Sequence, residues 1–95
     1  MLYRIVKMTF RMECIPDFIM IFENAQAIIL GFDGCQVVQA LQDVDDPRVF
    51  FTYSIWNNES ALNAYRNSKE FSEIWTKTKA LFADKPMAWS LQSLS

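Results

Sequence analysis

The segment 49-VFFTYSIW-56 is the strongest β-strand signal in the chain, and the other predicted elements are arranged around it. Nearly every side chain in it is β-branched or aromatic, which favours an extended strand. Alternate positions form two faces, and each face carries large apolar side chains: Val49, Phe51, Tyr53 and Ile55 on one, and Phe50, Thr52, Ser54 and Trp56 on the other. A strand that is apolar on both faces is expected inside a sheet with both faces covered.

Two more strands and one helix are predicted before this segment. Residues 2–12 alternate, and Arg4 is the one exception on the apolar face formed by Leu2, Val6, Met8, Phe10 and Met12. A helix begins at Pro16 and is stopped by Gly31, and a turn at residues 32–34 leads to a valine-rich strand at 35–41. Residues 43–47 contain three aspartates and a proline, which indicates the turn before residue 49.

Two helical segments and a last strand are predicted after it. Asn57 or Asn58 can cap the first segment, and Asn67 with Ser68 allows a bend and a fresh cap. The second segment carries an apolar stripe and ends at residues 84–86, and its stripe consists of Phe71, Ile74, Trp75, Thr78, Leu81 and Phe82. Residues 87–92 alternate as a strand. The order βαββαβ predicts an α+β, ferredoxin-like fold in one domain, 1–95, with two helices on one face of a four-stranded antiparallel sheet.

Composition narrows the function classes. Aromatic residues make up 15% of a short chain, an excess that suggests a partner surface or a ligand pocket. The net charge is −2 and the basic residues are scattered, so neither nucleic acid nor a membrane is expected as a partner. Arg4, Lys7 and Arg11 interrupt the apolar run that a signal peptide would need, which predicts a cytoplasmic protein.

The chain lacks the residues that several common kinds of catalytic site require. The chain has no histidine, only two glycines, and two cysteines, Cys14 and Cys35, that do not form a CxxC pair. We therefore expect no metal, and no cofactor bound through a glycine-rich phosphate loop. The acidic cluster at residues 43–46 could bind a hard cation, but a solvated turn is the preferred interpretation.

Aromatic side chains with polar tips are the remaining candidates. Tyr65 and Trp75 lie on adjoining helical segments, where Tyr53 or Trp56 could approach them from the sheet. A buried Tyr hydroxyl or Trp N–H needs a hydrogen-bond partner, which is either a backbone carbonyl or a ligand. Core packing is the simpler interpretation of any one of them, and their number keeps a pocket open as an alternative.

The order and spacing of several short motifs resemble the antibiotic biosynthesis monooxygenase family. The match runs from the first strand through the second helical segment, and the motifs are Gly31-Phe32-Asp33-Gly34-Cys35, Asp45-Asp46-Pro47, Phe51, Trp56, Ala61-Leu62, Tyr65, Ser68 and Phe71. The resemblance implies a homodimer in which two sheets meet as a dimeric α+β barrel. This agrees with the second sheet face, which two helices leave uncovered.

The resemblance also implies cofactor-independent oxygenation of a small phenolic or quinol-type substrate, in which the deprotonated substrate supplies the electron to dioxygen. The corresponding catalytic positions hold Tyr65 and Trp75, and the predicted substrate contacts are Tyr53, Trp56, Phe71 and Arg11. A haem-degrading branch of the family uses a histidine ligand that this chain lacks. Two alternatives stay open: a non-catalytic homodimer that binds a small aromatic metabolite, and a structural dimer module whose aromatic residues are all core.

Overall fold

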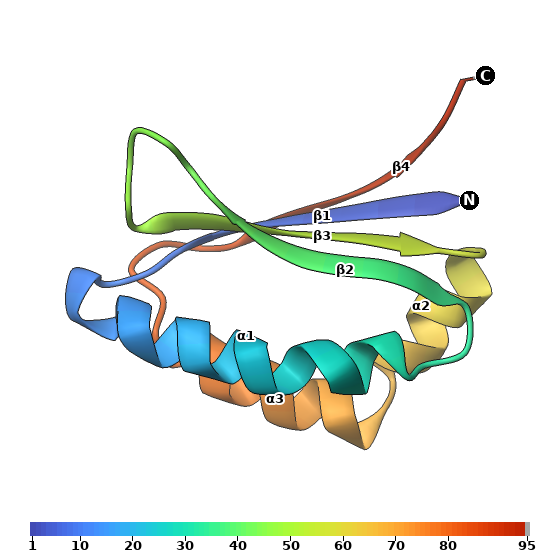
Figure 1. Ribbon diagram of the computed structural model, residues 1–95, viewed down its shortest axis with the longest axis horizontal. Coiled ribbons are helices and arrows are strands. Elements are labelled where there is room, and N and C mark those ends of the chain that lie inside the picture. The colour runs from blue at the N-terminus through green and yellow to red at the C-terminus, as the bar shows by residue number, and fades with distance from the viewer. Residues whose placement is uncertain (95) are drawn as a thin grey trace.

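The computed structural model describes residues 1–94 and contains one four-stranded sheet. Its strands are β1 (Leu2–Thr9), β2 (Cys35–Gln42), β3 (Val49–Trp56) and β4 (Met87–Gln92), in the spatial order β2-β3-β1-β4 with every pair antiparallel. Figure 1 shows α1 (Ile15–Leu30), α2 (Glu59–Arg66) and α3 (Lys69–Lys79) on one side of it. The α+β ferredoxin-like prediction is therefore confirmed, and β3 is an interior strand as expected.

Local sequence accounts for both ends of α1. Pro16 lies in the first turn, where its missing N–H costs nothing, and Asp17 complements the positive end of the helix dipole. The helix ends at Leu30, and the N–H of Gly31 donates to the carbonyls of Ala27 and Ile28. Gly31 keeps a right-handed φ of −75°, whereas Gly34, in the turn before β2, has a φ of +87°. The conformation that requires glycine is thus at Gly34.

Side-chain caps begin both α2 and α3, as predicted. The Asn58 side chain accepts a hydrogen bond from the N–H of Ala61 at 2.9 Å, and the Ser68 hydroxyl accepts one from the N–H of Phe71 at 3.1 Å. Each cap satisfies a backbone donor that the first turn of a helix leaves unpaired. The bend between them places two short helices over the sheet instead of one long helix.

The predicted ends of two elements, β1 and α3, were wrong. Both lie where the chain after β1 meets the chain after α3. β1 stops at Thr9, and Met12 begins a single 3-10 turn that ends at Cys14 and leaves Met12 exposed. α3 stops at Lys79, so the predicted stripe residues Leu81 and Phe82 follow the helix. The cause is tertiary: the N–H of Ala83 donates to the carbonyl of Thr9 at 2.8 Å, and that of Arg11 donates to Leu81 at 3.1 Å. These bonds draw both segments out of their regular elements.

The core lies between the sheet and the helices. Trp56, 1% exposed, and Phe10, 0% exposed, are the largest fully buried side chains, and each belongs to one of two clusters on this side. Within residues 1–94 no helix covers the opposite face, so the expectation that β3 is covered on both sides is not met within one chain. The strand register brings apolar side chains of all four strands together there, including Val37, Tyr3, Ile5, Phe51, Tyr53, Ile55, Met87, Trp89 and Leu91.

Within residues 1–94, no helix combines the length and the apolar character that crossing a membrane would require.

We predict that Gly34→Ala destabilises the fold. A Cβ at this position would lie 2.6 Å from the Cβ of Ala61 in α2, and the positive φ would strain any other residue. The two effects together should lower the free energy of unfolding by about 2–4 kcal/mol. Urea denaturation of the variant and the parent measures the change.

Gly31→Ala is the matched control, because its φ is ordinary and its new Cβ would lie 3.3 Å from the Ile28 carbonyl oxygen. It should change the free energy of unfolding by about 1 kcal/mol or less. Equal effects of the two substitutions would contradict the assignment of the strained turn to Gly34.

Candidate functional site

A cavity of about 350 Å³ lies between the three helices and the covered face of the sheet. Its walls are mostly aliphatic and aromatic, with polar side chains from β1, β3, α2 and α3 at a few points. The aromatic lining residues are Phe18, Phe22, Trp56, Tyr65, Phe71 and Trp75. A concave apolar site with a few polar groups is the usual form of a small-molecule site. The cavity favours a ligand site over a structural dimer module whose aromatic residues are all core.

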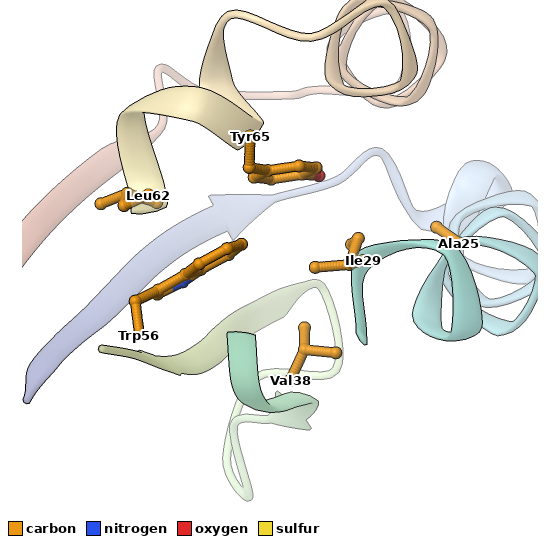
Figure 2. Close-up of a cluster of buried hydrophobic side chains, with 6 residues drawn as sticks. All are labelled: Ala25, Ile29, Val38, Trp56, Leu62 and Tyr65. Carbon is orange, nitrogen blue, oxygen red and sulfur yellow. The ribbon is translucent and has the colours of Figure 1, made fainter. Parts of the chain in front are cut away.

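Tyr65 is held over the sheet by aromatic contacts on three sides. Figure 2 shows its ring stacked on that of Trp56. The two centroids are 5.4 Å apart, and Phe32 and Phe71 meet the Tyr65 ring edge-on at 5.0 and 5.2 Å. Trp56 comes from the end of β3 and Tyr65 from α2, so the cap at Asn58 sets their separation. The side chain is 8% exposed, and these contacts fix the direction of its hydroxyl.

The Tyr65 hydroxyl forms no hydrogen bond with any part of residues 1–94. No completely buried side-chain oxygen or nitrogen in those residues lacks a partner, so this hydroxyl retains some accessible surface. Tyr65 is also a lining residue of the cavity. Burial penalises the phenolate, and the nearby Cys35 adds to the effect, so the pKa of Tyr65 rises to about 12. At neutral pH the group is a hydrogen-bond donor and not a base.

Trp75 and Phe71 form a wall of the cavity on α3. Their rings stack with centroids 5.9 Å apart and an interplanar angle of 12°, and Phe82 meets Trp75 edge-on at 5.6 Å. The predicted residues Tyr65, Trp75, Trp56 and Phe71 therefore all line one cavity.

Two other polar groups at the cavity are already paired. The indole N–H of Trp56 donates to the Ser54 hydroxyl at 3.0 Å, and the Thr78 hydroxyl donates to the Ile74 carbonyl at 2.8 Å. These bonds satisfy buried donors inside the protein. Trp56 consequently supports the ring of Tyr65 from below without a free donor of its own, whereas Tyr65 has a hydroxyl without a partner in residues 1–94.

Two of the predicted substrate contacts lie elsewhere. Tyr53 points to the opposite face of the sheet, where its ring is 6.5 Å from that of Tyr3, because it has the other parity from Trp56 on β3. Arg11 donates to the carbonyls of Ala80 at 2.9 Å and Phe82 at 3.3 Å and so ties the chain after β1 to the end of α3. Neither residue lines the cavity.

The structure adds two cationic residues that the sequence analysis did not select, Arg4 and Arg66. Arg4 lies on the helix-facing side of β1, and its guanidinium donates to the Ser90 hydroxyl of β4 at 2.9 Å. Arg66 is the last residue of α2. A signal for Arg4 was present, because it is the only charged residue on the apolar face of the first strand.

The structure gives little support to the other candidate sites, a metal site and the acidic turn. In residues 1–94 no group of three or more His, Cys, Asp or Glu side chains is arranged to hold a metal ion. Asp46 forms an ion pair with Arg48 at 3.2 Å, and hydrogen bonds from Arg48 lower the pKa of that carboxyl, in keeping with a solvated turn. Burial raises the pKa of the Cys35 thiol.

Comparisons with known proteins agree on the architecture. A model of the antibiotic biosynthesis monooxygenase family matches residues 1–77. A solved structure described as an antibiotic biosynthesis monooxygenase superposes with a TM-score of 0.93 at 16% identity and covers 100% of both chains. A comparison with curated protein sequences gives no significant match.

Two further solved structures have the same fold at low identity. A conserved protein from Methanosarcina mazei gives a TM-score of 0.90 at 18% identity, over 96% of this chain and 91% of that one. SnoaB from Streptomyces nogalater, described as a cofactor-independent oxygenase, gives 0.88 at 14% identity, over 99% and 93% of the two chains.

We predict that stability falls between about pH 10 and about pH 12 in part because of Tyr65. Its pKa is about 12 in the folded protein, whereas an exposed tyrosine has a pKa of about 10, so the folded state keeps a proton that the unfolded state loses in this interval. Stability is therefore fully present below pH 10 and decreases as the pH rises. Urea denaturation at a series of pH values should show a shallower decline in Tyr65→Phe than in the parent.

A parallel decline in the two proteins would contradict this. Spectrophotometric titration supplies a second check, because Tyr65→Phe should remove the tyrosine ionisation near pH 12.

Proposed function

This chain belongs to the antibiotic biosynthesis monooxygenase family, and from that premise we propose that it is a cofactor-independent monooxygenase acting on a small phenolic or quinol-type substrate. The observation that carries the proposal is the cavity, whose mostly aromatic and aliphatic walls include Tyr65, a phenol with no hydrogen-bond partner in residues 1–94. A flat aromatic substrate fits between such walls. Its oxygen would accept the hydrogen bond that Tyr65 does not make within the chain.

In the proposed reaction the substrate itself is the electron donor. A substrate with an acidic CH₂ next to a phenol ring loses a proton, and the resulting anion passes one electron to dioxygen. The two radicals combine at carbon to form a peroxide, which takes up a proton and eliminates water to leave a carbonyl. One oxygen atom of dioxygen enters the product and the other leaves in water, so the electrons balance without an external reductant.

The protein would contribute position, exclusion of water and stabilisation of charge. The aromatic walls orient the ring and keep water from the radical pair. Tyr65 remains protonated at neutral pH because its pKa is about 12, so it can donate to the phenolate oxygen on which negative charge accumulates. A fixed donor in an apolar cavity is worth more than the same donor in water.

The first proton must leave the substrate without a protein base of the usual kind. The chain has no histidine, and no aspartate or glutamate lines the cavity. The proposal therefore favours substrates whose anion is stabilised by delocalisation, such as anthrones and quinols, so that water can take up the proton.

We predict that Tyr65→Phe lowers turnover. A panel of quinols and anthrone-like phenols is screened for oxygen uptake, and the variant is compared with the parent on an accepted substrate. Losing one donor aimed at developing charge should reduce kcat about tenfold to a thousandfold.

Tyr53→Phe is the matched control, because it removes the same hydroxyl from the opposite face of the sheet. Unchanged turnover in Tyr65→Phe, or an equal loss in Tyr53→Phe, would remove Tyr65 from the mechanism.

One observation favours a second function, a non-catalytic protein that binds a small aromatic metabolite. The cavity offers binding surface and a hydrogen-bond donor, but no carboxylate or imidazole for proton transfer. The two functions differ in one measurement. Binding of the whole substrate panel without oxygen consumption would favour the binding protein.

We also propose that the chain is a homodimer joined through the uncovered face of the sheet. This face presents Trp89, 39% exposed, Leu91, 48% exposed, and Met87, 52% exposed, beside the Tyr3 and Tyr53 rings. An apolar area of this extent, spread over four strands, is rarely left in water. A second copy placed on it would complete the dimeric α+β barrel, with an interface of about 2,000 Å² or more.

Light scattering at micromolar concentration should report twice the chain mass of 11.1 kDa, and Trp89→Asp should convert the protein to monomers. The reason is that a carboxylate on this face would lose its water when the second copy binds. Val44→Asp, at a 95% exposed position in the β2–β3 loop, is the control and should stay dimeric. A monomeric parent would exclude the barrel.

A further inference from the structure

We propose that the cavity is specific for an aromatic ligand that carries a carboxylate, and that Arg4 and Arg66 bind this group. The inference rests on the proposed function, because both place the ligand in the same cavity. It adds the charge of the ligand and the end of the cavity at which that charge lies.

Arg4 occupies an unusual position for an arginine. It lies on an interior strand, half-buried, on the face whose other β1 side chains are Leu2, Val6 and Met8. Of its five N–H donors, the structure pairs Nη1 with Ser90 and leaves the rest without a protein acceptor in residues 1–94. These donors are accessible to water or to an anion, and an anion bound there would offset the cost of partly burying the cation.

Arg66 brings a second positive charge to the same place. It lines the cavity with Arg4, and its charge adds to the effect of burial in lowering the pKa of Arg4. The three ion pairs within residues 1–94 involve Arg11, Arg48 and Lys69, so neither cavity arginine has a carboxylate partner. This pair of cations is thus uncompensated in a chain whose net charge is −2.

A structural role explains other arginines of the chain better than it explains Arg4. Arg11 donates to two backbone carbonyls and pairs with Glu13, and its donors are used to hold two segments together. The place of Arg66 in the last turn of α2 suits the helix dipole. Neither explanation applies to Arg4, which is in a strand and has one short polar contact.

The geometry favours a carboxylate over a phenolate beside Arg4 and Arg66. The guanidinium group matches the two oxygens of a carboxylate with parallel N–H donors. The unpaired donor suited to a single phenolic oxygen is Tyr65, which is next to Arg66 in the sequence. A ligand with both groups would use Tyr65 for its hydroxyl or carbonyl and the arginines for its carboxylate.

The test is isothermal titration calorimetry with two probes that share one ring system, 2-naphthoate and the neutral 2-naphthalenemethanol. The parent should bind the carboxylate about tenfold to a hundredfold more tightly than the alcohol, which is the usual effect of a hydrogen bond to a charged group. Arg4→Gln should remove most of this preference and leave the affinity for the alcohol nearly unchanged. Arg66→Gln should remove a smaller part, because Arg66 is exposed.

Arg48→Gln is the matched control. It removes the same charge from the chain, but Arg48 lies in the β2–β3 turn, paired with Asp46 and away from the cavity lining. It should leave the preference for naphthoate intact. Equal affinities of the parent for the two probes, binding of neither, or an equal loss in Arg48→Gln and Arg4→Gln would overturn the proposal.

Two further measurements make the result decisive. Circular dichroism checks the fold of each variant, and if Arg4→Gln does not fold, Arg66→Gln decides, because its exposed side chain can be replaced without disturbing the core. Oxygen uptake is measured separately: selective naphthoate binding without turnover of any substrate contradicts the proposed oxygenase alone. Turnover without a preference for carboxylates contradicts this inference alone.

Discussion

The burial of Trp56 is the constraint on which the rest of the structure depends. Its indole is 1% exposed, and a buried N–H must have an acceptor, which Ser54 provides two residues earlier on the same face of β3. Because Ser54 and Trp56 share a parity, this bond fixes which face of β3 is covered. Tyr65 then stacks on the indole, which sets the position of α2 over the end of the strand.

The same constraint determines where open space is left. α1 packs mainly on β2 and α3, so the β1 and β4 side of the sheet has less cover from the helices, and all six residues of β4 are exposed. The aromatic residues that surround Tyr65 pack against its ring and leave the remaining gap open. The cavity extends from them to the side of the sheet where Arg4 meets Ser90.

Local sequence predicted much of this structure because the deciding signals are local. Alternation along β3 and β4, the caps at Asn58 and Ser68, and Pro16 in the first turn of α1 act within a few residues, and the elements they predict are present. The errors occur where distant segments meet. Thr9 pairs with Ala83, which no local pattern reveals, and this contact ends β1 early.

The candidate site was predicted in part for a similar reason. Tyr65, Trp75, Phe71 and Trp56 were placed by helical spacing and strand parity, and they line one cavity. Tyr53 was grouped with them although its parity on β3 differs from that of Trp56. Arg4 was set aside as an exception to a pattern, and only the tertiary structure places it at the cavity.

The three tryptophans of this chain give it built-in optical reporters. Trp56 is sealed in the core against Tyr65, Trp75 stands at the cavity wall, and Trp89 lies on the uncovered sheet face. Indole fluorescence depends on the polarity and the neighbours of each ring, so the three emit from three different environments. Single-tryptophan variants would therefore follow unfolding, ligand entry and subunit association as separate signals from one small protein.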